Sequence, residues 1–275
     1  WRRKPIPMKP YCDSTCRGLQ PEKYDTDYTV HGSIALKARF AIPFPYNSQS
    51  MYIQWVSIWY GKKNIIRDVS ITINPWEFVF LIGSSGSGKT SFIKMLIGDL
   101  APKSWHIRDS KRRDIYTLSQ KEMIEYRRKL WVVFQDFKLL RKKTVYENVA
   151  FAMEVCGYGD DVIKNRVPEI LKQVGMLDKK NTFVEYLSWW EIQRTSIARA
   201  LIHNPEIIIG DEPTGNLDPK NSKDIIELLE KLNQWGKTII IATHDDRMVN
   251  HHRKRVIAFR DGAIVSDEPE WKYIL

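Results

Sequence analysis

The sequence predicts an α/β fold with a three-layer core built around a mainly parallel β-sheet. Short apolar segments that are typical of buried strands alternate along the chain with segments whose apolar residues have helical spacing. In addition, one of these strands turns through a glycine-rich loop directly into a helix. Both features are typical of units in which helices connect parallel strands across the faces of a sheet.

The first strands lead into the glycine-rich loop. Segments 51–54 and 65–73 predict strands, and the apolar run 78–82 predicts a buried strand. A helix over 91–97 follows the loop. The loop and the first residue of that helix are Gly83, Ser84, Ser85, Gly86, Ser87, Gly88, Lys89, Thr90 and Ser91.

This loop fits the phosphate-binding pattern G-x-x-x-x-G-K-[ST]. A strand that turns through glycines into a helix points main-chain N–H groups and a positive helix end at one spot, which suits a polyphosphate. Lys89 can then reach the β- and γ-phosphates of a nucleotide, and the Thr90 hydroxyl can coordinate Mg²⁺. For the eight residues alone, a solvated Gly/Ser loop is the alternative. The strand before the loop and the helix after it favour nucleotide binding.

The range from about 104 to 190 is mostly helical and predicts a helical subdomain inserted into the core. Helical spacing predicts helices over 144–155, 162–177 and 191–202. Two further buried strands, 207–209 and 238–242, are separated by a helix over 222–232.

Two carboxylates, Asp211 and Glu212, follow the strand 207–209. Asp211 is placed to hold Mg²⁺ through water, and Glu212 is placed to polarise an attacking water molecule. An exposed acidic turn is the alternative for any Asp-Glu pair. The phosphate loop after another strand of the same kind makes that alternative the weaker one.

Composition excludes several classes of protein. At 275 residues with 43% apolar residues, the chain can bury the core of one large domain or of two small ones. It contains no run of 18 apolar residues, so no segment is expected to span a membrane. Cys12, Cys16 and Cys156 form neither a disulfide framework nor a zinc pattern, which favours free thiols in a reducing compartment. The net charge of +10 does not by itself predict a partner.

Taken in order, several segments of residues 51–275 resemble the motifs of the ABC ATPases. The residues that carry the resemblance are Tyr60, Gln135 of a Q-loop, Leu187, Ser188 and Glu191 of a signature segment, Asp211 and Glu212, Asp218, and His244 of a switch. Alone, each is weak, because a packing aromatic, a surface amide or a strand-end histidine is a common structural feature. Together and in this order they leave little room for chance.

The resemblance implies a P-loop NTPase fold, an ABC-type nucleotide-binding domain with an antiparallel β subdomain and a helical subdomain. It implies that Glu212, His244 and Lys89 are catalytic and that Mg²⁺ is held by Thr90, Gln135 and Asp211. It implies that ATP is bound by Tyr60, residues 83–91, Gln135, Ser188, Trp189, Trp190, Glu191 and Asp218. Two copies then enclose two ATP molecules, with the phosphate loop of one facing Ser188 of the other.

Within this family the likeness is greatest to the cell-division ATPases, through residues 134–140 and 144–155. It implies a peripheral subunit on the cytoplasmic face of the bacterial plasma membrane that drives an integral membrane partner and binds no nucleic acid. The expected docking face is the helical insertion, with Phe137, Leu139, Leu140 and the helix that starts at Thr144. The first alternative is the ATPase subunit of a lipoprotein-release or macrolide-type exporter. The second is a soluble ABC protein that acts on ribosomes or DNA.

The chain departs from the family after Ser188, where Trp189 and Trp190 stand in place of two glycines. Other tryptophans at glycine-like positions are Trp76, Trp105, Trp131 and Trp271. Because the chain has 10 Trp and only 14 Gly, we interpret these tryptophans as UGA codons that the organism itself reads as glycine. ATP hydrolysis is expected if 189 and 190 are glycine. The alternative is a degenerate ATPase that has lost turnover.

Residues 1–50 show no sustained pattern. We interpret this poorly patterned extension as a translation of sequence upstream of the gene, which is not part of the native protein. Met51 is then the true start.

Overall fold

The computed structural model describes residues 51–60, 63–101, 107–108, 113–133, 137–215 and 217–269. The strands are β1 (Met51–Tyr60), β2 (Lys63–Ile73), β3 (Phe78–Ile82), β4 (Ile107–Arg108), β5 (Leu130–Val133), β6 (Ile207–Asp211), β7 (Thr238–Thr243), β8 (Arg255–Arg260) and β9 (Ala263–Glu268). The α-helices are α1 (Lys89–Leu96), α2 (Gln120–Lys129), α3 (Val145–Val155), α4 (Asp160–Gln173), α5 (Trp189–Leu201), α6 (Pro219–Gln234) and α7 (Asp246–His252). The predicted extension, residues 1–50, lies outside the described residues.

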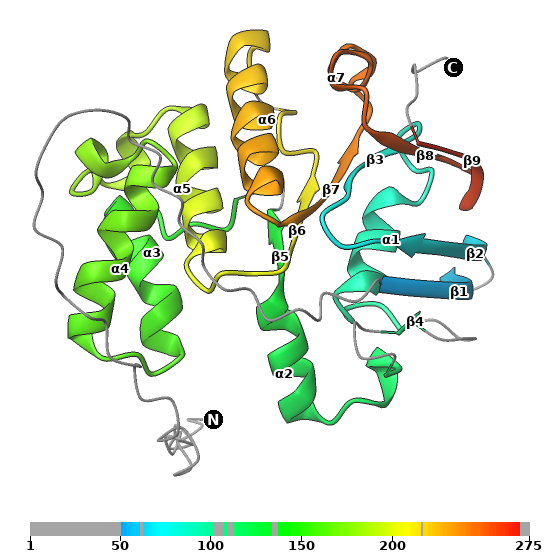
Figure 1. Cartoon of the computed structure of the whole chain (residues 1–275), viewed down its shortest axis with the longest axis horizontal. Helices are drawn as coiled ribbons and strands as arrows, with labels where there is room; N and C mark the ends of the chain where they lie inside the picture. The colour runs from blue at the N-terminus through cyan, green and yellow to red at the C-terminus, as the bar shows by residue number, and fades with distance from the viewer. Residues whose placement is uncertain are drawn as a thin grey trace, which may run out of the picture. The chain divides into compact units, whose positions relative to one another are not determined.

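Among the described residues, six strands form the central sheet in the order β5-β6-β7-β3-β8-β9 (Figure 1). The pairs from β5 to β8 are parallel, and β9 is antiparallel to β8. β3 and β7 are buried along their whole length, as their uninterrupted apolar sequences predict. The predicted α/β class with a mainly parallel sheet is confirmed.

Alternate side chains of β3 enter two different hydrophobic cores, because the side chains of a strand point alternately to its two faces. Phe78, Phe80 and Ile82 pack in a core that also contains residues of α3, α4, α5 and α6. Val79 and Leu81 pack in a core that also contains residues of α1, β1 and β2. The central sheet is therefore the middle one of three layers.

β1, β2 and β4 form a second, antiparallel sheet in the order β2-β1-β4. The ladder between β1 and β2 changes register between Ile53 and Val56. This sheet is the antiparallel β subdomain that the resemblance implies.

Helices α3, α4 and α5 pack against one another beside the central sheet (Figure 1). The prediction of a helix as far as residue 177 is wrong at its end. α4 stops at Gln173 because Gly175 takes a left-handed φ of 69°, a common way for a helix to end. The predicted helical range 104–190 also contains β4 and β5, which pair with β1 and β6. We propose that the helical subdomain consists of α3, α4 and α5.

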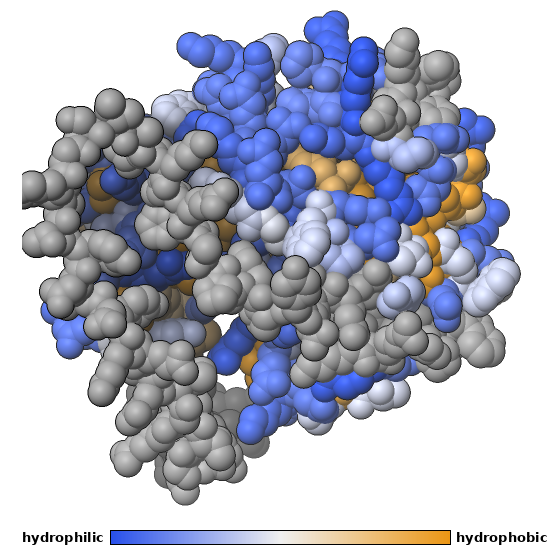
Figure 2. Space-filling view, in the orientation of Figure 1, coloured by the Kyte–Doolittle hydropathy of each residue, from blue (hydrophilic) through white to orange (hydrophobic). Residues whose placement is uncertain are grey.

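In the view of Figure 2, hydrophilic residues make up most of the described surface, and hydrophobic residues show in small separate patches. The described helices include none that is long and apolar enough to cross a membrane.

Several tryptophans occupy positions that suit glycine better than a large side chain. Trp55 and Trp76 have φ of 53° and 66°, in the left-handed region that favours glycine. Trp55, Trp76 and Trp189 are 66%, 59% and 59% exposed, although indoles are mostly buried in proteins.

Trp131, another of the tryptophans at glycine-like positions, has different surroundings. It lies inside β5 and packs against the core on the helical side of the sheet, so it occupies a strand rather than a turn. Its indole Nε1 is nevertheless buried without a hydrogen-bond partner among the described residues. Trp105 and Trp271 lie outside the described residues.

Candidate active site

The glycine-rich loop joins the end of β3 to the start of α1. Gly83, Gly86 and Gly88 have φ of 146°, 79° and 110°, which residues with a Cβ rarely adopt. A Cβ on Gly83 would lie 2.4 Å from the main-chain oxygen of Phe259. The sequence therefore needs glycine there to turn the chain and to aim the positive end of α1 at the loop. Ser84, Ser85 and Gly86 are exposed at the tip of this loop, and Ser91 is half-buried in the first turn of α1.

Lys89 is held inside the loop that precedes it. Its Nζ donates hydrogen bonds to the main-chain oxygens of Gly83 at 2.7 Å and Ser84 at 3.2 Å. Burial lowers the pKa of Lys89, while the nearby carboxylates of Glu212 and Asp211 act in the opposite direction. Burial makes the charged form of the Lys89 amine less favourable, and a bound anion would stabilise that form.

The Ser87 hydroxyl is a second sign that the loop accepts an anion. Ser87 is 4% exposed, and its Oγ has no hydrogen-bond partner among the described residues. A buried hydroxyl without a partner is costly. A phosphate oxygen in the loop would supply the missing acceptor, so the residues present fit a nucleotide polyphosphate.

Thr90 and Asp211 bring the loop and β6 together. The Thr90 Oγ1 donates a hydrogen bond of 3.2 Å to Oδ1 of Asp211. Burial raises the pKa of Asp211, the Thr90 hydrogen bond lowers it, and Glu212 raises it further. Hydroxyl and carboxylate oxygens at one place are the ligands that Mg²⁺ prefers. The third predicted ligand, Gln135, lies outside the described residues.

Glu212 and His244 form a pair across two neighbouring strands. Glu212 follows β6 and His244 follows β7, which run parallel side by side. The His244 Nδ1 lies 2.8 Å from Oε1 of Glu212. Glu212 has a left-handed φ of 53°, and its N–H donates to the main-chain oxygen of Ala242 at 2.9 Å. Strained conformations of this kind cluster at active sites, where the surrounding structure holds them.

The signature segment begins α5. The main-chain N–H of Ser188 donates to Oε2 of Glu191 at 2.9 Å and the Ser188 side chain accepts from the main-chain N–H of Glu191, which together form a capping box. The Oγ of Ser188 also donates to Oε2 of Glu191, at 2.6 Å. Burial alone would raise the pKa of Glu191, but its hydrogen bonds with Ser188 and Lys179 outweigh burial and leave the pKa lowered. The polar end of the helix is therefore well ordered.

The two tryptophans lie on the first turn of α5. The Trp189 ring lies 5.8 Å from the ring of Phe137 between centroids. The guanidinium of Arg194 lies 5.3 Å from the centroid of the Trp190 ring. The two indoles thus occupy the space around the N-terminus of α5. Glycine at both positions would leave room there for an anion.

Asp218 caps the start of α6. Its carboxylate accepts hydrogen bonds from the main-chain N–H groups of Lys220 and Asn221 at 3.0 and 3.1 Å. The contacts with Asn221 and Lys220 lower the pKa of Asp218. Tyr60 is the last residue of β1, and its side chain lies outside the described part of the structure.

The structure brings only some of the expected site residues together. Lys89, Thr90, Asp211, Glu212 and His244 converge at the carboxyl ends of β3, β6 and β7. Within the described residues, no hydrogen bond or ion pair joins Ser188 or Glu191 to the phosphate loop.

Residues 66–215 match the family model for ABC transporters. Over 208 residues, the chain is 48% identical to the cell division ATP-binding protein FtsE of Bacillus subtilis, covering 76% of this chain and 91% of that protein. Over 213 residues, it is 45% identical to the FtsE protein of Mycobacterium tuberculosis, covering 78% and 92%. It is also similar to the dimeric structure of a bacterial ABC transporter cassette, with a TM-score of 0.71 and 32% identity over 81% of this chain and all of that one.

Proposed function

The chain belongs to the ABC transporter family, and from this premise we propose that it is the ATP-hydrolysing subunit of a membrane complex that acts in bacterial cell division. The observation that carries the ATPase activity is the Glu212–His244 pair beside a glycine loop that holds Lys89 and Thr90. The relatives named FtsE supply the cell-division context.

Each of the site residues has a separate role in the proposed hydrolysis. Lys89 and the N–H groups of the loop stabilise the negative charge of the transferring phosphoryl group. Glu212 accepts a hydrogen bond from the attacking water and takes its proton as the water oxygen bonds to the γ-phosphorus, the bond from that phosphorus to the bridging oxygen breaks, and ADP leaves. His244 holds the carboxylate of Glu212 in place at 2.8 Å and is positioned to contact the γ-phosphate. Thr90, Gln135 and Asp211 would hold Mg²⁺, which neutralises charge on the phosphates.

Two copies are proposed to form the active species. The signature segment and the phosphate loop of one chain make no polar contact in the described structure, and a similar cassette is dimeric. Ser188 of one copy would then face the phosphate loop of the other, and Asp218 would lie near the interface between the two copies.

An integral membrane protein of the FtsX type is the proposed partner. The face proposed for docking is α3 with the segment that precedes it, where Leu140, Phe151 and Val155 are 41%, 46% and 69% exposed. Exposed apolar side chains of this kind are typical of interaction surfaces. Phe137, which was expected on this face, is buried. The protein would then be peripheral, on the cytoplasmic face of the plasma membrane, and would bind no nucleic acid.

Glycine at positions 189 and 190 is part of this proposal. The left-handed main chain of Trp55 and Trp76 and the exposed ring of Trp189 support it, because all three suit glycine. Two indoles at the start of α5 would fill the space that a phosphate needs.

The ATPase proposal is tested with the variant Glu212→Gln in the full chain that also carries Trp189→Gly and Trp190→Gly. We expect hydrolysis to fall by about 10²-fold or more, because the general base is lost, while ATP still binds. Glu227→Gln, on the exposed side of α6, is the matched control and should hydrolyse ATP like its parent. Equal rates for Glu212→Gln and its parent would overturn the assignment.

The partner is tested by tagging this chain in its own cells, extracting the membranes with detergent, and identifying the integral membrane protein that co-purifies with it. Retention of an FtsX-like protein supports the proposal. Retention of a permease of different topology would favour an exporter, and salt-sensitive binding of RNA or duplex DNA would favour the soluble class.

A further inference from the structure

Gln193 is a buried amide without a hydrogen-bond partner in the part of the chain that the structure describes. It lies in α5, four residues before Ile197, and is 0% exposed. Among the described residues, neither its Oε1 nor its Nε2 has a hydrogen-bond partner. Native proteins rarely leave a buried amide in this state, and each case calls for a reason.

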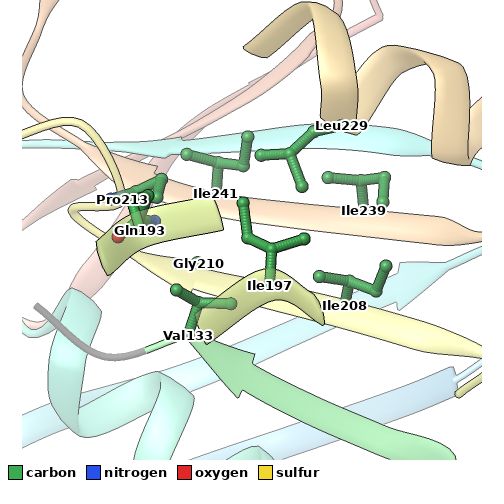
Figure 3. A pocket seen from close by; sticks show the side chains of 9 residues that line it. All are labelled: Val133, Gln193, Ile197, Ile208, Gly210, Pro213, Leu229, Ile239 and Ile241. Carbon is green, nitrogen blue, oxygen red and sulfur yellow. The ribbon is translucent and has the colours of Figure 1, made fainter. Parts of the chain in front are cut away.

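The amide lies in a small pocket between α5 and the central sheet (Figure 3). All other residues that line the pocket are apolar: Val133, Ile197, Ile208, Gly210, Pro213, Leu229, Ile239 and Ile241. The pocket has no room for a water molecule, so a solvent molecule cannot satisfy the amide.

The pocket adjoins the segment that carries the two site carboxylates. Gly210 directly precedes Asp211, and Pro213 directly follows Glu212. Figure 3 shows the side chain of Gln193 beside the ring of Pro213. Gln193 therefore lines the same pocket as the two residues that flank the site carboxylates.

Directional bonds hold α5 on its other side. The Arg194 guanidinium donates to the main-chain oxygen of Val174 at 2.8 Å. The Arg199 guanidinium donates to the main-chain oxygens of Phe137 and Lys138 at 2.8 and 2.6 Å. Toward the sheet, by contrast, the pocket offers apolar packing, which is non-directional and tolerates a small shift of the helix.

We propose that Gln193 is a positioning residue for the proposed ATPase reaction. When ATP is bound, α5 shifts on the sheet and the Gln193 amide hydrogen-bonds to the main chain of residues 210–214. The bond fixes the signature segment relative to Asp211 and Glu212. In the state without nucleotide the unpaired amide destabilises the resting arrangement, and its pairing favours the ATP-bound one.

The test is Gln193→Met, which has nearly the same length and no polar atoms, in the full chain with Trp189→Gly and Trp190→Gly. Ile197→Met is the matched control, because it changes packing in the same pocket and leaves the amide intact. Gln193→Leu is a second apolar variant, so the result does not depend on how one side chain packs. Melting temperature is measured with and without ATP and Mg²⁺, and kcat is measured by phosphate release.

We expect Gln193→Met to melt at a higher temperature than its parent without nucleotide and to gain less on addition of ATP. Its kcat should be about tenfold lower, as for the loss of one hydrogen bond made in the ATP-bound state. Ile197→Met should melt lower and keep the ATP-induced gain. An ATP-induced gain in Gln193→Met equal to that of its parent would overturn the inference. If the parent hydrolyses no ATP, the proposed function fails, and the ATP-induced gain still decides the role of Gln193.

Discussion

At Trp76 the main chain is left-handed, with φ of 66°, and strains any residue that carries a Cβ. The turn is held by the main chain: its N–H donates to Thr238 Oγ1 at 2.8 Å, and its oxygen accepts from Asn233 Nδ2 at 2.7 Å. Glycine can make both bonds and avoids the strain. The local structure therefore favours glycine at position 76, where the sequence has tryptophan.

We expect Trp76→Gly to raise the free energy of unfolding by about 1 kcal/mol, the cost of the left-handed region for a residue with a Cβ. Trp235→Gly is the control, since Trp235 is similarly exposed but has φ of −84°. There glycine only adds freedom to the unfolded chain, so stability should not rise. Chemical denaturation of both variants checks this, and a loss of stability in Trp76→Gly would contradict the account.

For the candidate site, the sequence shows which residues could take part but not which of them lie in contact. The phosphate loop could be read directly, because its glycines, Lys89 and Thr90 are consecutive. The Glu212–His244 contact depends on β6 and β7 being neighbours, which no local pattern shows. Gln193 gave no signal of a role, since a glutamine within a helix is ordinary until its burial is known.

At the scale of elements, buried strands and capped helices were the most predictable. β3 and β7 agree with their apolar runs, because both faces of each strand are covered. β8 and β9 were missed. Arg255 at the start of β8 forms ion pairs of 2.7 Å with Glu77 and with Asp267 of β9, and such distant partners cannot be read from a short window.

Capping boxes define the starts of α2, α3 and α5. In α3, Glu147 accepts hydrogen bonds from Lys143, from the main-chain N–H of Thr144 and from the Thr144 side chain, and these contacts lower its pKa from 4.5 to about 2. Because the folded-state pKa is depressed, this stabilisation is present above pH 4.5 and is lost as the pH falls toward 2.

We therefore expect Glu147→Gln to destabilise the protein at neutral pH and to have a shrinking effect between pH 4.5 and pH 2. Glutamine can still cap the helix, so the variant removes mainly the charge. Urea titrations at several pH values measure the effect. A difference in stability that stays constant over this range would contradict the assignment.

For the whole molecule, the proposed hydrolysis uses two chains and an open signature segment. The phosphate loop and Ser188 lie in different parts of one chain, and Trp189 is exposed at the helix end that would meet a second copy. Filling that space with indoles prevents close approach, because packed interfaces absorb added volume poorly.

We expect the double variant Trp189→Gly, Trp190→Gly to hydrolyse ATP about 10²-fold faster than the chain with tryptophan, the usual effect of one lost transition-state contact to phosphate. Trp235→Gly is the control and should leave the rate unchanged, since Trp235 lies at the end of α6. Phosphate release at saturating ATP and Mg²⁺ measures both. Equal rates in the double variant and its parent would show that the indoles are no obstacle.

The central claim, that the functional protein is an ABC ATPase with glycine in its signature segment, is tested most directly in protein purified from its own cells. The measurement is the mass of the tryptic peptide 181–194, which spans both positions. The account predicts the mass of a peptide with glycine at 189 and 190. The mass of a peptide with two tryptophans would contradict it and would mark a chain that binds ATP in its loop without closing on it.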